Sequence, residues 1–347
     1  MTAVSFQNVS IVFGDRPQSA LPLMDAGQDR GEIQTSTGQV LGVHDCTVDV
    51  AEGEILVLMG LSGSGKSTLL RAANGLNPVA RGRVLVNDGQ DMIDVTNADA
   101  DTLRRMRSNQ LSMVFQQFGL LPWRNVRDNV NLPLELAGVP RNDAMPRVEK
   151  QLALVGLDEW ADRKVGELSG GMQQRVGLAR AFVTDAPILL MDEPFSALDP
   201  LIRTKLQDEL LELQTKLRRT LIFVSHDLDE AFKLGNRIAI MEGGRIVQCG
   251  TPQEIFRTPA TDYVAEFVQH MNPLGVLRLR DIMQPGASDG PQLSADMLVR
   301  DALTMLIEAG QATVAEDGTP IGHVSKDDIL RALSAPDADR PTALSNA

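Results

Sequence analysis

Aromatic and basic residues are scarce in this sequence. Only 4% of the 347 residues are aromatic, with one Tyr and two Trp, and acidic residues outnumber basic ones, so that the formal net charge is −13. A protein that binds nucleic acid usually presents a basic surface. We therefore expect no nucleic-acid partner.

Cysteines are also few, and no hydrophobic run is long. Cys46 and Cys249 lie far apart and belong to no Cys/His cluster, which favours reduced thiols in a cytoplasmic protein. Apolar runs such as Ile55–Met59 are much shorter than the ~18 residues that cross a bilayer. The N-terminus lacks the basic and apolar regions of a signal peptide. If the protein acts at a membrane, we expect other subunits to span it.

The hydrophobic pattern alternates between buried strands and helices. Residues 4–13 and 40–50 alternate as a pair of strands, and Leu201 to Leu217 repeats leucine at helical spacing. Such alternation is typical of an α/β fold with a mainly parallel sheet covered on both faces. Further buried strands are predicted at Glu54–Met59, Pro187–Met191 and Leu221–Ser225, a helix at Thr68–Gly75, and a hairpin at Ile238–Met241 and Arg245–Cys249.

Two segments interrupt this alternation. Residues 14–39 are polar, and Leu21–Asp25 is a candidate short helix within them. Residues 118–167 contain helices separated by proline-containing loops, which indicates a helical insertion instead of more sheet.

A phosphate-binding motif follows the strand at Glu54–Met59. Residues 60–67 read Gly-Leu-Ser-Gly-Ser-Gly-Lys-Ser and match GxxxxGK[ST] at each fixed position. Glycines let such a loop fold around phosphate with its N–H groups pointing inward. Lys66 is expected to reach the β- and γ-phosphates, and Ser67 to bind Mg²⁺. The candidate nucleotide-binding residues here are Gly60, Ser62, Gly63, Ser64, Gly65, Lys66, Ser67 and Thr68.

An acidic pair follows the strand at Ile188–Met191. Ligands bind at the carboxyl ends of strands in open α/β sheets, which places Asp192 at such a site. We expect Asp192 to hold Mg²⁺ through water and Glu193 to activate the attacking water.

The stretch Leu168–Arg175 reads Leu-Ser-Gly-Gly-Met-Gln-Gln-Arg and resembles the signature motif of the ATP-binding-cassette (ABC) family. In that family the motif contacts the γ-phosphate of ATP held by the other subunit, so two chains enclose two nucleotides head to tail. The resemblance implies a homodimer that binds ATP with Mg²⁺. The residues it assigns to this contact are Ser169, Gly170, Gly171 and Gln173.

Four further residues match motifs of the same family. Gln116 corresponds to the glutamine that links Mg²⁺ and water to the helical insertion, with Gln117 as the neighbouring alternative. Asp199 resembles the aspartate that crosses the dimer interface, and His226 the histidine that contacts the γ-phosphate. Phe13 resembles the aromatic residue that stacks on adenine, although a plain core phenylalanine is the alternative.

The resemblance covers roughly residues 4–270 and implies an α/β P-loop NTPase cassette. Its parts are a mainly parallel core, an antiparallel β subdomain and a helical insertion at about 118–170. We expect the ATP-binding domain at 1–271, a linker at 272–291, a module at 292–335 that resembles one CBS repeat, and a disordered tail at 336–347.

A single cassette without a membrane span resembles the ATPase of an importer. Residues 115–129 and 270–274 resemble the quaternary-amine branch, and the insert at 14–39 resembles its choline-specific subgroup. This resemblance implies permease subunits, a periplasmic or extracellular substrate-binding protein, and a peripheral location on the inner face of the cell membrane. The expected solute is choline, or glycine betaine. Import of an amino acid, polyamine or sugar, and a non-transport ABC ATPase, remain alternatives.

Overall fold

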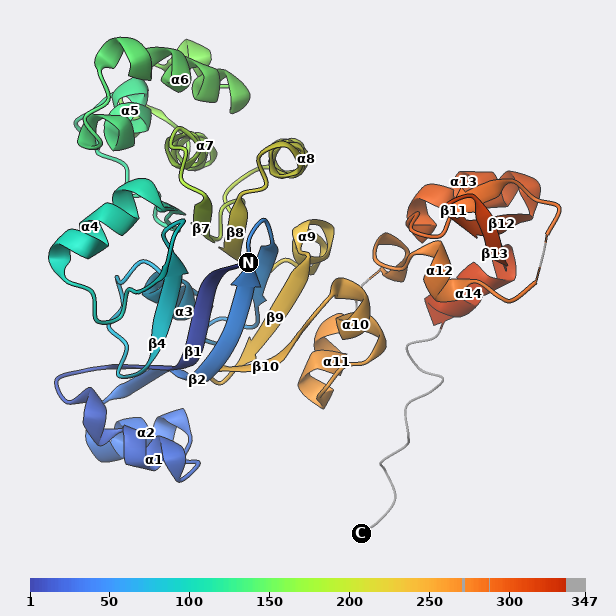
Figure 1. Ribbon diagram of the computed structural model, residues 1–347, viewed down its shortest axis with the longest axis horizontal. Helices are drawn as coiled ribbons and strands as arrows, with labels where there is room; N and C mark the ends of the chain where they lie inside the picture. Colours follow the sequence, from blue (N-terminus) through green and yellow to red (C-terminus); the bar gives the residue numbers. More distant parts are fainter. Residues whose placement is uncertain (270–271, 287, 335–347) are drawn as a thin grey trace. The chain divides into compact units, whose positions relative to one another are not determined.

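The computed structural model describes residues 1–269, 272–286 and 288–334 (Figure 1). The chain forms two compact units, each with its own hydrophobic core. The first contains residues 1–226 and 234–249, and the second contains residues 227–233 and the chain from residue 250 onward. The second unit takes in residues before the expected boundary at residue 271, and Phe256 among them packs on its core.

A mainly parallel sheet of six strands forms the centre of the first unit. Its order is β10-β9-β3-β8-β7-β6, and β3 pairs in parallel with both β8 and β9. The inner strands are buried on both faces, as their continuous apolar runs predict. The strands are β3 (Ile55–Met59), β6 (Leu111–Val114), β7 (Ile188–Asp192), β8 (Thr220–Val224), β9 (Arg237–Glu242) and β10 (Arg245–Gly250).

An antiparallel sheet packs against this core. Its order is β2-β1-β4-β5, and Phe6 and Val48 face each other across the β1–β2 pair. The paired strands at 4–13 and 40–50 are therefore confirmed, whereas β4, β5 and β6 had no clear sequence signal. The strands are β1 (Thr2–Phe13), β2 (Val40–Ala51), β4 (Arg81–Asn87) and β5 (Met92–Asp94).

Helices cover the first unit, and polar residues start several of them. Asp99, Asn125, Ser169 and Asp199 each accept a backbone N–H of the first turn, which satisfies donors that the helix itself leaves unpaired. The helices are α3 (Lys66–Ala72), α4 (Ala100–Asn109), α5 (Val126–Leu136), α6 (Arg141–Leu154), α7 (Gly170–Phe182) and α8 (Pro200–Leu217), with 3₁₀ turns at Asp158–Trp160 and Val165–Glu167.

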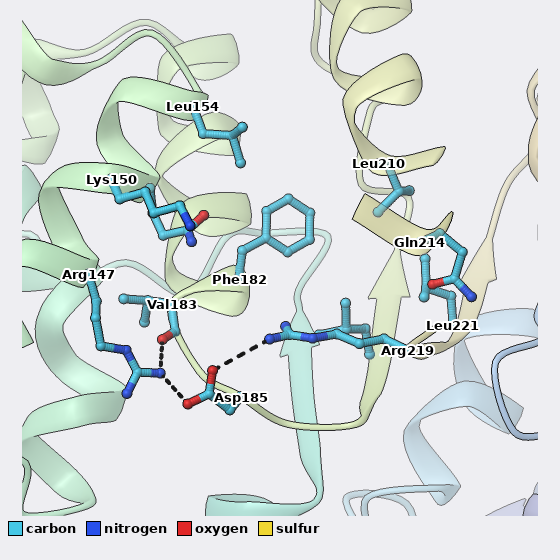
Figure 2. Close-up of a pocket in the computed structure, with 12 residues that line it drawn as sticks. Arg147, Lys150, Leu154, Phe182, Val183, Asp185, Leu210, Gln214, Arg219 and Leu221 are labelled. Carbon is cyan, nitrogen blue, oxygen red and sulfur yellow. Dashed lines mark hydrogen bonds and ion pairs between the residues drawn. The ribbon is translucent and has the colours of Figure 1, made fainter. Parts of the chain in front are cut away.

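Asp185, between α7 and β7, joins the helical insertion to the central sheet (Figure 2). Its carboxylate accepts Arg147 of α6 at 2.7 Å and lies 3.8 Å from Arg219, which precedes β8. Both pairs border a cavity of about 250 Å³ with apolar walls that include Phe182. Burial lowers the pKa of Arg219. The Asp185 side chain is 84% exposed, so we assign these ion pairs little stability.

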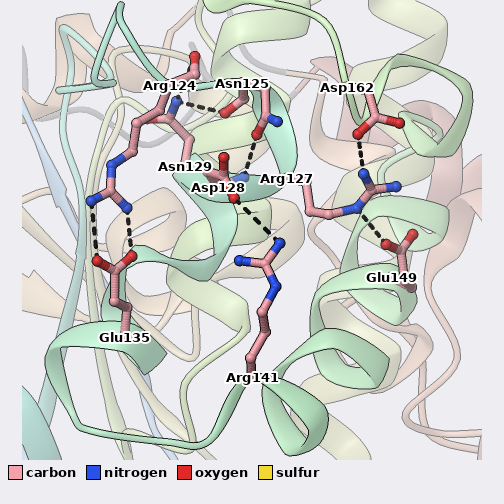
Figure 3. Close-up of polar contacts among 9 residues, drawn as sticks. All are labelled: Arg124, Asn125, Arg127, Asp128, Asn129, Glu135, Arg141, Glu149 and Asp162. Atoms are coloured by element: carbon pink, nitrogen blue, oxygen red, sulfur yellow. Dashed lines mark hydrogen bonds and ion pairs between the residues drawn. The ribbon is translucent and has the colours of Figure 1, made fainter.

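Asn129 of α5 holds the loop between β6 and α5 in place through hydrogen bonds (Figure 3). Asn129 is fully buried. Its Oδ1 accepts the backbone N–H of Leu121 at 2.7 Å, and its Nδ2 donates to the carbonyl of Asn125 at 2.9 Å. Arg124, in this loop, forms an ion pair with Glu135 of α5 at 2.6 Å. The loop therefore has a defined shape although it is exposed.

Residues 14–39 form a small helical insert. It contains a 3₁₀ turn at Pro17–Ser19, α1 (Leu21–Asp25) and α2 (Arg30–Thr37). The short helix at Leu21–Asp25 is confirmed, whereas α2 was not predicted because Ile33 is its one buried residue. Asp29 and Glu32 form a capping box at the start of α2. A separate core of Val12, Ala20, Met24, Ile33 and Leu41 holds the insert to β1 and β2.

The second unit ends in a small three-stranded sheet. β11 and β12 pair in parallel, and β12 and β13 join antiparallel through Asp317 and Gly318, both in the left-handed conformation of a tight hairpin turn. Its elements are α9 (Leu228–Leu234), α10 (Pro252–Arg257), α11 (Asp262–Val268), a 3₁₀ turn at Pro273–Gly275, α12 (Leu279–Ile282), β11 (Gln292–Ser294), α13 (Val299–Ala309), β12 (Gln311–Glu316), β13 (Thr319–Ser325) and α14 (Lys326–Ser334).

Part of the stretch expected to be a linker, 272–291, is folded. Leu277 and Leu279, the latter the first residue of α12, are apolar and buried in the core of the second unit. The tail expected at 336–347 lies outside the described residues.

Both cysteines are free thiols, as expected. Cys46 is buried in β2, its thiol donates to the Gly244 carbonyl at 3.3 Å, and burial raises its pKa to about 11. The Cys249 sulfur accepts Arg237 at 3.1 Å. Throughout the described ranges we find no helix with the length and apolar character to cross a membrane.

Candidate functional site

The phosphate loop connects the end of β3 to the start of α3. Gly60, Gly63 and Gly65 all have positive φ, at 141°, 79° and 101°. A Cβ on Gly60 would lie 2.1 Å from the Met241 carbonyl oxygen, and one on Gly65 would lie 2.7 Å from that of Gly42. The loop geometry therefore requires glycine at these two positions both for its backbone conformation and for the space.

Lys66, the first residue of α3, folds back over this loop. Its Nζ donates to the carbonyls of Gly60 at 2.8 Å and Leu61 at 2.9 Å. The side chain is buried, and this burial lowers the pKa of Lys66, against the opposing effect of Glu193 and Asp192. The ammonium is therefore held beside the loop, where a phosphate oxygen can take the place of a carbonyl.

Ser67 and Asp192 meet at the carboxyl edge of the parallel sheet. Ser67 Oγ donates to Asp192 Oδ1 at 2.6 Å, and Asp192 is fully buried. Arg71, one turn further along α3, donates to Asp192 Oδ2 at 2.7 Å. A hydroxyl and a carboxylate this close, next to a phosphate loop, fit the oxygen ligands that Mg²⁺ prefers. Arg71 had not been predicted, since no sequence spacing links it to Asp192.

Glu193 and His226 face each other beyond Asp192. His226 Nδ1 lies 3.7 Å from Glu193 Oε2, with side chains 62% and 20% exposed. Glu193 has a φ of 51°, and its N–H donates to the Val224 carbonyl at 3.2 Å. This left-handed backbone, costly for a residue with a side chain, turns Glu193 out of the strand direction at the sheet edge. The Glu193 carboxylate and the His226 imidazole therefore lie next to each other at the carboxyl edge of the sheet.

Gln174 supports Glu193 from α7 and had not been predicted. It is 1% exposed, its Nε2 donates to the Glu193 carbonyl at 3.0 Å, and its Oε1 accepts the Ala197 N–H at 2.9 Å. The predicted Gln173, also on α7, donates instead to the Leu168 carbonyl at 3.1 Å, in the segment just before the helix. The amide of Gln174 therefore ties α7 to the segment between Glu193 and Asp199.

Other expected residues are not joined to the phosphate loop within the chain. Ser169 Oγ accepts the Met172 N–H at 3.4 Å, and Asp199 accepts that of Ile202 at 3.0 Å. Gln116 and Gln117 are both exposed in the turn after β6. No hydrogen bond between described residues links Ser169, Gly170, Gly171, Gln173, Asp199 or Gln116 to residues 60–68.

Phe13 lies at the end of β1, beside the phosphate loop. A Cβ on Gly42 would lie 2.8 Å from Phe13 Cε2 and 3.0 Å from Thr68 Cγ2, so the ring and Thr68 both pack against Gly42. Phe13 is 38% exposed and belongs to none of three core clusters found among the described residues. Its exposed ring is available for stacking, which stays a prediction.

Known proteins resemble this chain in both sequence and fold. The model of the ABC transporter family matches residues 43–196. The glycine betaine/proline betaine transport ATP-binding protein ProV of Salmonella typhimurium is 44% identical over 331 residues, covering 94% of this chain and 82% of ProV. The chain belongs to the ABC transporter family. It is an ABC ATPase.

Two further relatives extend this likeness. The trimethylamine N-oxide transport ATP-binding protein TmoW of Ruegeria pomeroyi is 42% identical to this ABC ATPase, covering 95% of the chain and 96% of TmoW. The solved dimeric, post-hydrolysis state of the cassette MJ0796, bound to ADP and Pi, has a TM-score of 0.60 at 29% identity, covering 72% of this chain and 98% of that one. The ABC cassette fold is therefore established for the first unit.

Proposed function

We propose that this ABC ATPase binds ATP with Mg²⁺ and powers the uptake of a quaternary amine. The observation that carries the solute class is the identity over nearly the whole chain, 44% to ProV and 42% to TmoW against 36% to a methionine import ATPase. The match to ProV and TmoW covers 94% and 95% of the chain, far beyond the family match at 43–196. Their names contain glycine betaine, proline betaine and trimethylamine N-oxide, so we propose a betaine as the transported solute in preference to choline. A methionine import ATPase of Rhodopseudomonas palustris, 36% identical over 93% of the chain, represents the alternative.

Recognition of the amine itself must come from a partner. A quaternary ammonium donates no hydrogen bond, and aromatic cages bind it by cation–π attraction. With 4% aromatic residues this chain is a poor source of such a cage. The proposal therefore includes a binding protein and membrane-spanning permease subunits, with this chain on the inner face of the membrane. Trp123, 68% exposed on the loop held by Asn129, offers an apolar contact for a permease.

The solute assignment predicts a specific transport defect. Cells that lack the gene should lose uptake of labelled glycine betaine, and wild-type protein should restore it whereas Glu193→Gln should not. Choline, methionine and maltose are measured in the same cells. Unchanged betaine and choline uptake, with loss of methionine or maltose uptake, would reject the quaternary-amine proposal and leave the ATPase assignment intact.

We also propose that two copies complete each ATP site. The support is that Ser169 and Asp199 bond only the first turns of their own helices, and that MJ0796 is dimeric. In such a pair Ser169 and Gly171 of one copy face the ATP bound by Lys66 of the other.

Mixing two inactive variants tests this arrangement. Lys66→Ala and Ser169→Ala chains, each inactive alone, should regain ATPase activity when mixed, because a heterodimer contains one site with both residues intact. The control mixes Lys66→Ala with Asp192→Ala, which alter the same side of the site. Equal activity in the two mixtures would show that Ser169 acts within its own chain.

The unit that contains β11 to β13 has the strand–helix–strand–strand–helix order expected of one CBS repeat. We propose that it is CBS-like and pairs with a second copy. Its exposed apolar residues on α13 and α14 support this: Met305, Ile307, Leu330 and Leu333.

A further inference from the structure

The insert formed by residues 14–39 reaches the phosphate loop through one side chain. Arg30, at the start of α2, donates from Nη1 to the Gly63 carbonyl and from Nη2 to the Gly42 carbonyl at 2.6 Å. Gly63 belongs to the phosphate loop, and Gly42 is the β2 residue on which the Phe13 ring packs. One guanidinium therefore bridges the two parts of the site that are expected to hold phosphate and adenine.

The surroundings of Arg30 are shaped for a guanidinium. Gly244, in the turn after β9, completes them, since a Cβ there would lie 2.7 Å from Arg30 Nη2. Gly42 and Gly63 supply the two carbonyls that accept from Arg30, and of these three glycines Gly244 is the one whose added side chain would meet the guanidinium. The planar fork of arginine suits two backbone carbonyls that lie side by side, whereas lysine presents a single ammonium.

The positive charge of Arg30 has no counter-ion among the residues that the structure describes. The two neighbouring carboxylates are used in the capping box. Asp29 Oδ1 accepts the Glu32 N–H at 2.8 Å, and Glu32 Oε2 accepts the Asp29 N–H at 3.0 Å. No ion pair joins Arg30 to any residue that the structure describes, and its Nε is buried without a hydrogen-bond partner. Burial lowers the pKa of Arg30. A half-buried cation without a paired carboxylate favours an anion nearby.

We propose that Arg30 is a positioning residue of the ATP site, which holds the phosphate loop in its binding conformation and adds positive charge beside the phosphates. The insert is thus part of the nucleotide site. This role rests on ATP binding by the cassette, but it does not depend on which solute is transported.

Removal of Arg30 should weaken ATP binding and spare the chemical step. In the assembled transporter Arg30→Ala should raise KM for ATP about 10-fold, as expected for loss of hydrogen bonds from a charged donor, with kcat at saturating ATP within about twofold of wild type. Arg30→Lys should give an intermediate KM, since it keeps the charge but bonds one carbonyl at most.

Arg81→Ala is the matched control. Arg81 pairs with Asp25 of the insert at 2.8 Å and touches no residue of the phosphate loop, so its KM should be that of wild type. A wild-type KM in Arg30→Ala, or in Arg30→Lys, would overturn the bridging role, and so would an equal loss of kcat. Lys66→Ala serves as the reference for a damaged ATP site: if wild type itself binds no ATP, the proposed function fails separately from Arg30.

Discussion

Replacing Glu193 with glutamine is expected to reduce ATP turnover by about 10²-fold or more, the contribution of a positioned general base. Glutamine keeps the shape of the side chain but cannot accept a proton from water. Glu193 follows Asp192 directly, and its carboxylate lies 3.7 Å from His226 Nδ1. Because neither Lys66 nor Ser67 is altered, ATP should remain bound. The measurement is phosphate release by the transporter assembled with its membrane subunits.

Glu159→Gln provides the control for this substitution. Glu159 is exposed in the 3₁₀ turn at Asp158–Trp160, so the same chemical change there should leave turnover unaltered. If Glu193→Gln hydrolysed ATP at a rate within a few-fold of wild type, Glu193 would not be the base.

Lys66→Ala is expected to act on binding as well as on rate. Its ammonium is the buried charge of the loop, and charge-assisted contacts to phosphate are among the stronger hydrogen bonds. Loss of such contacts should lower ATP affinity on the order of 10²-fold. Titration of a fluorescent ATP analogue measures this directly, and the same titration of Glu193→Gln should give wild-type affinity.

Lys150→Ala is the matched control for Lys66→Ala. It is exposed on α6 and forms no ion pair with the described residues, so Lys150→Ala should bind ATP normally. Wild-type affinity in Lys66→Ala would contradict the assignment of residues 60–67 as the phosphate loop.

The sequence predicted those parts of the site whose residues are adjacent in the chain. The spacing of the residues from Gly60 to Ser67 predicts a phosphate loop, because the motif needs glycine for the backbone conformation and lysine for the phosphate contact at set positions. The strand before Asp192 is likewise a continuous apolar run. Strands β4 and β6 were not predicted, because neither is a continuous buried run: β4 mixes exposed, half-buried and buried residues, and β6 mixes buried with half-buried ones.

Contacts between distant segments could not be predicted. Gln173 and Gln174 are neighbours on a helix, where successive residues point in different directions, and only the structure decides that Gln174 faces Glu193. Arg71 meets Asp192 from 121 positions away. Arg30 lies on a polar helix with one buried residue, which gives no amphipathic signal. The role of Gln116 stays a prediction, since it is exposed and no hydrogen bond between described residues joins its side chain to the other site residues.

The environment of the two thiols determines how the chain can be labelled. With a pKa of about 11, Cys46 is thiolate in only about one molecule in 10⁴ at pH 7, and it is shielded by the backbone of Gly244. Cys249 is half-buried and therefore the accessible nucleophile of the pair. A Cys249→Ser background would leave maleimide to react at cysteines introduced by design. Fluorophores or spin labels placed on α2 and α7 would then report the distance between the insert and the helix that follows Ser169, with and without ATP.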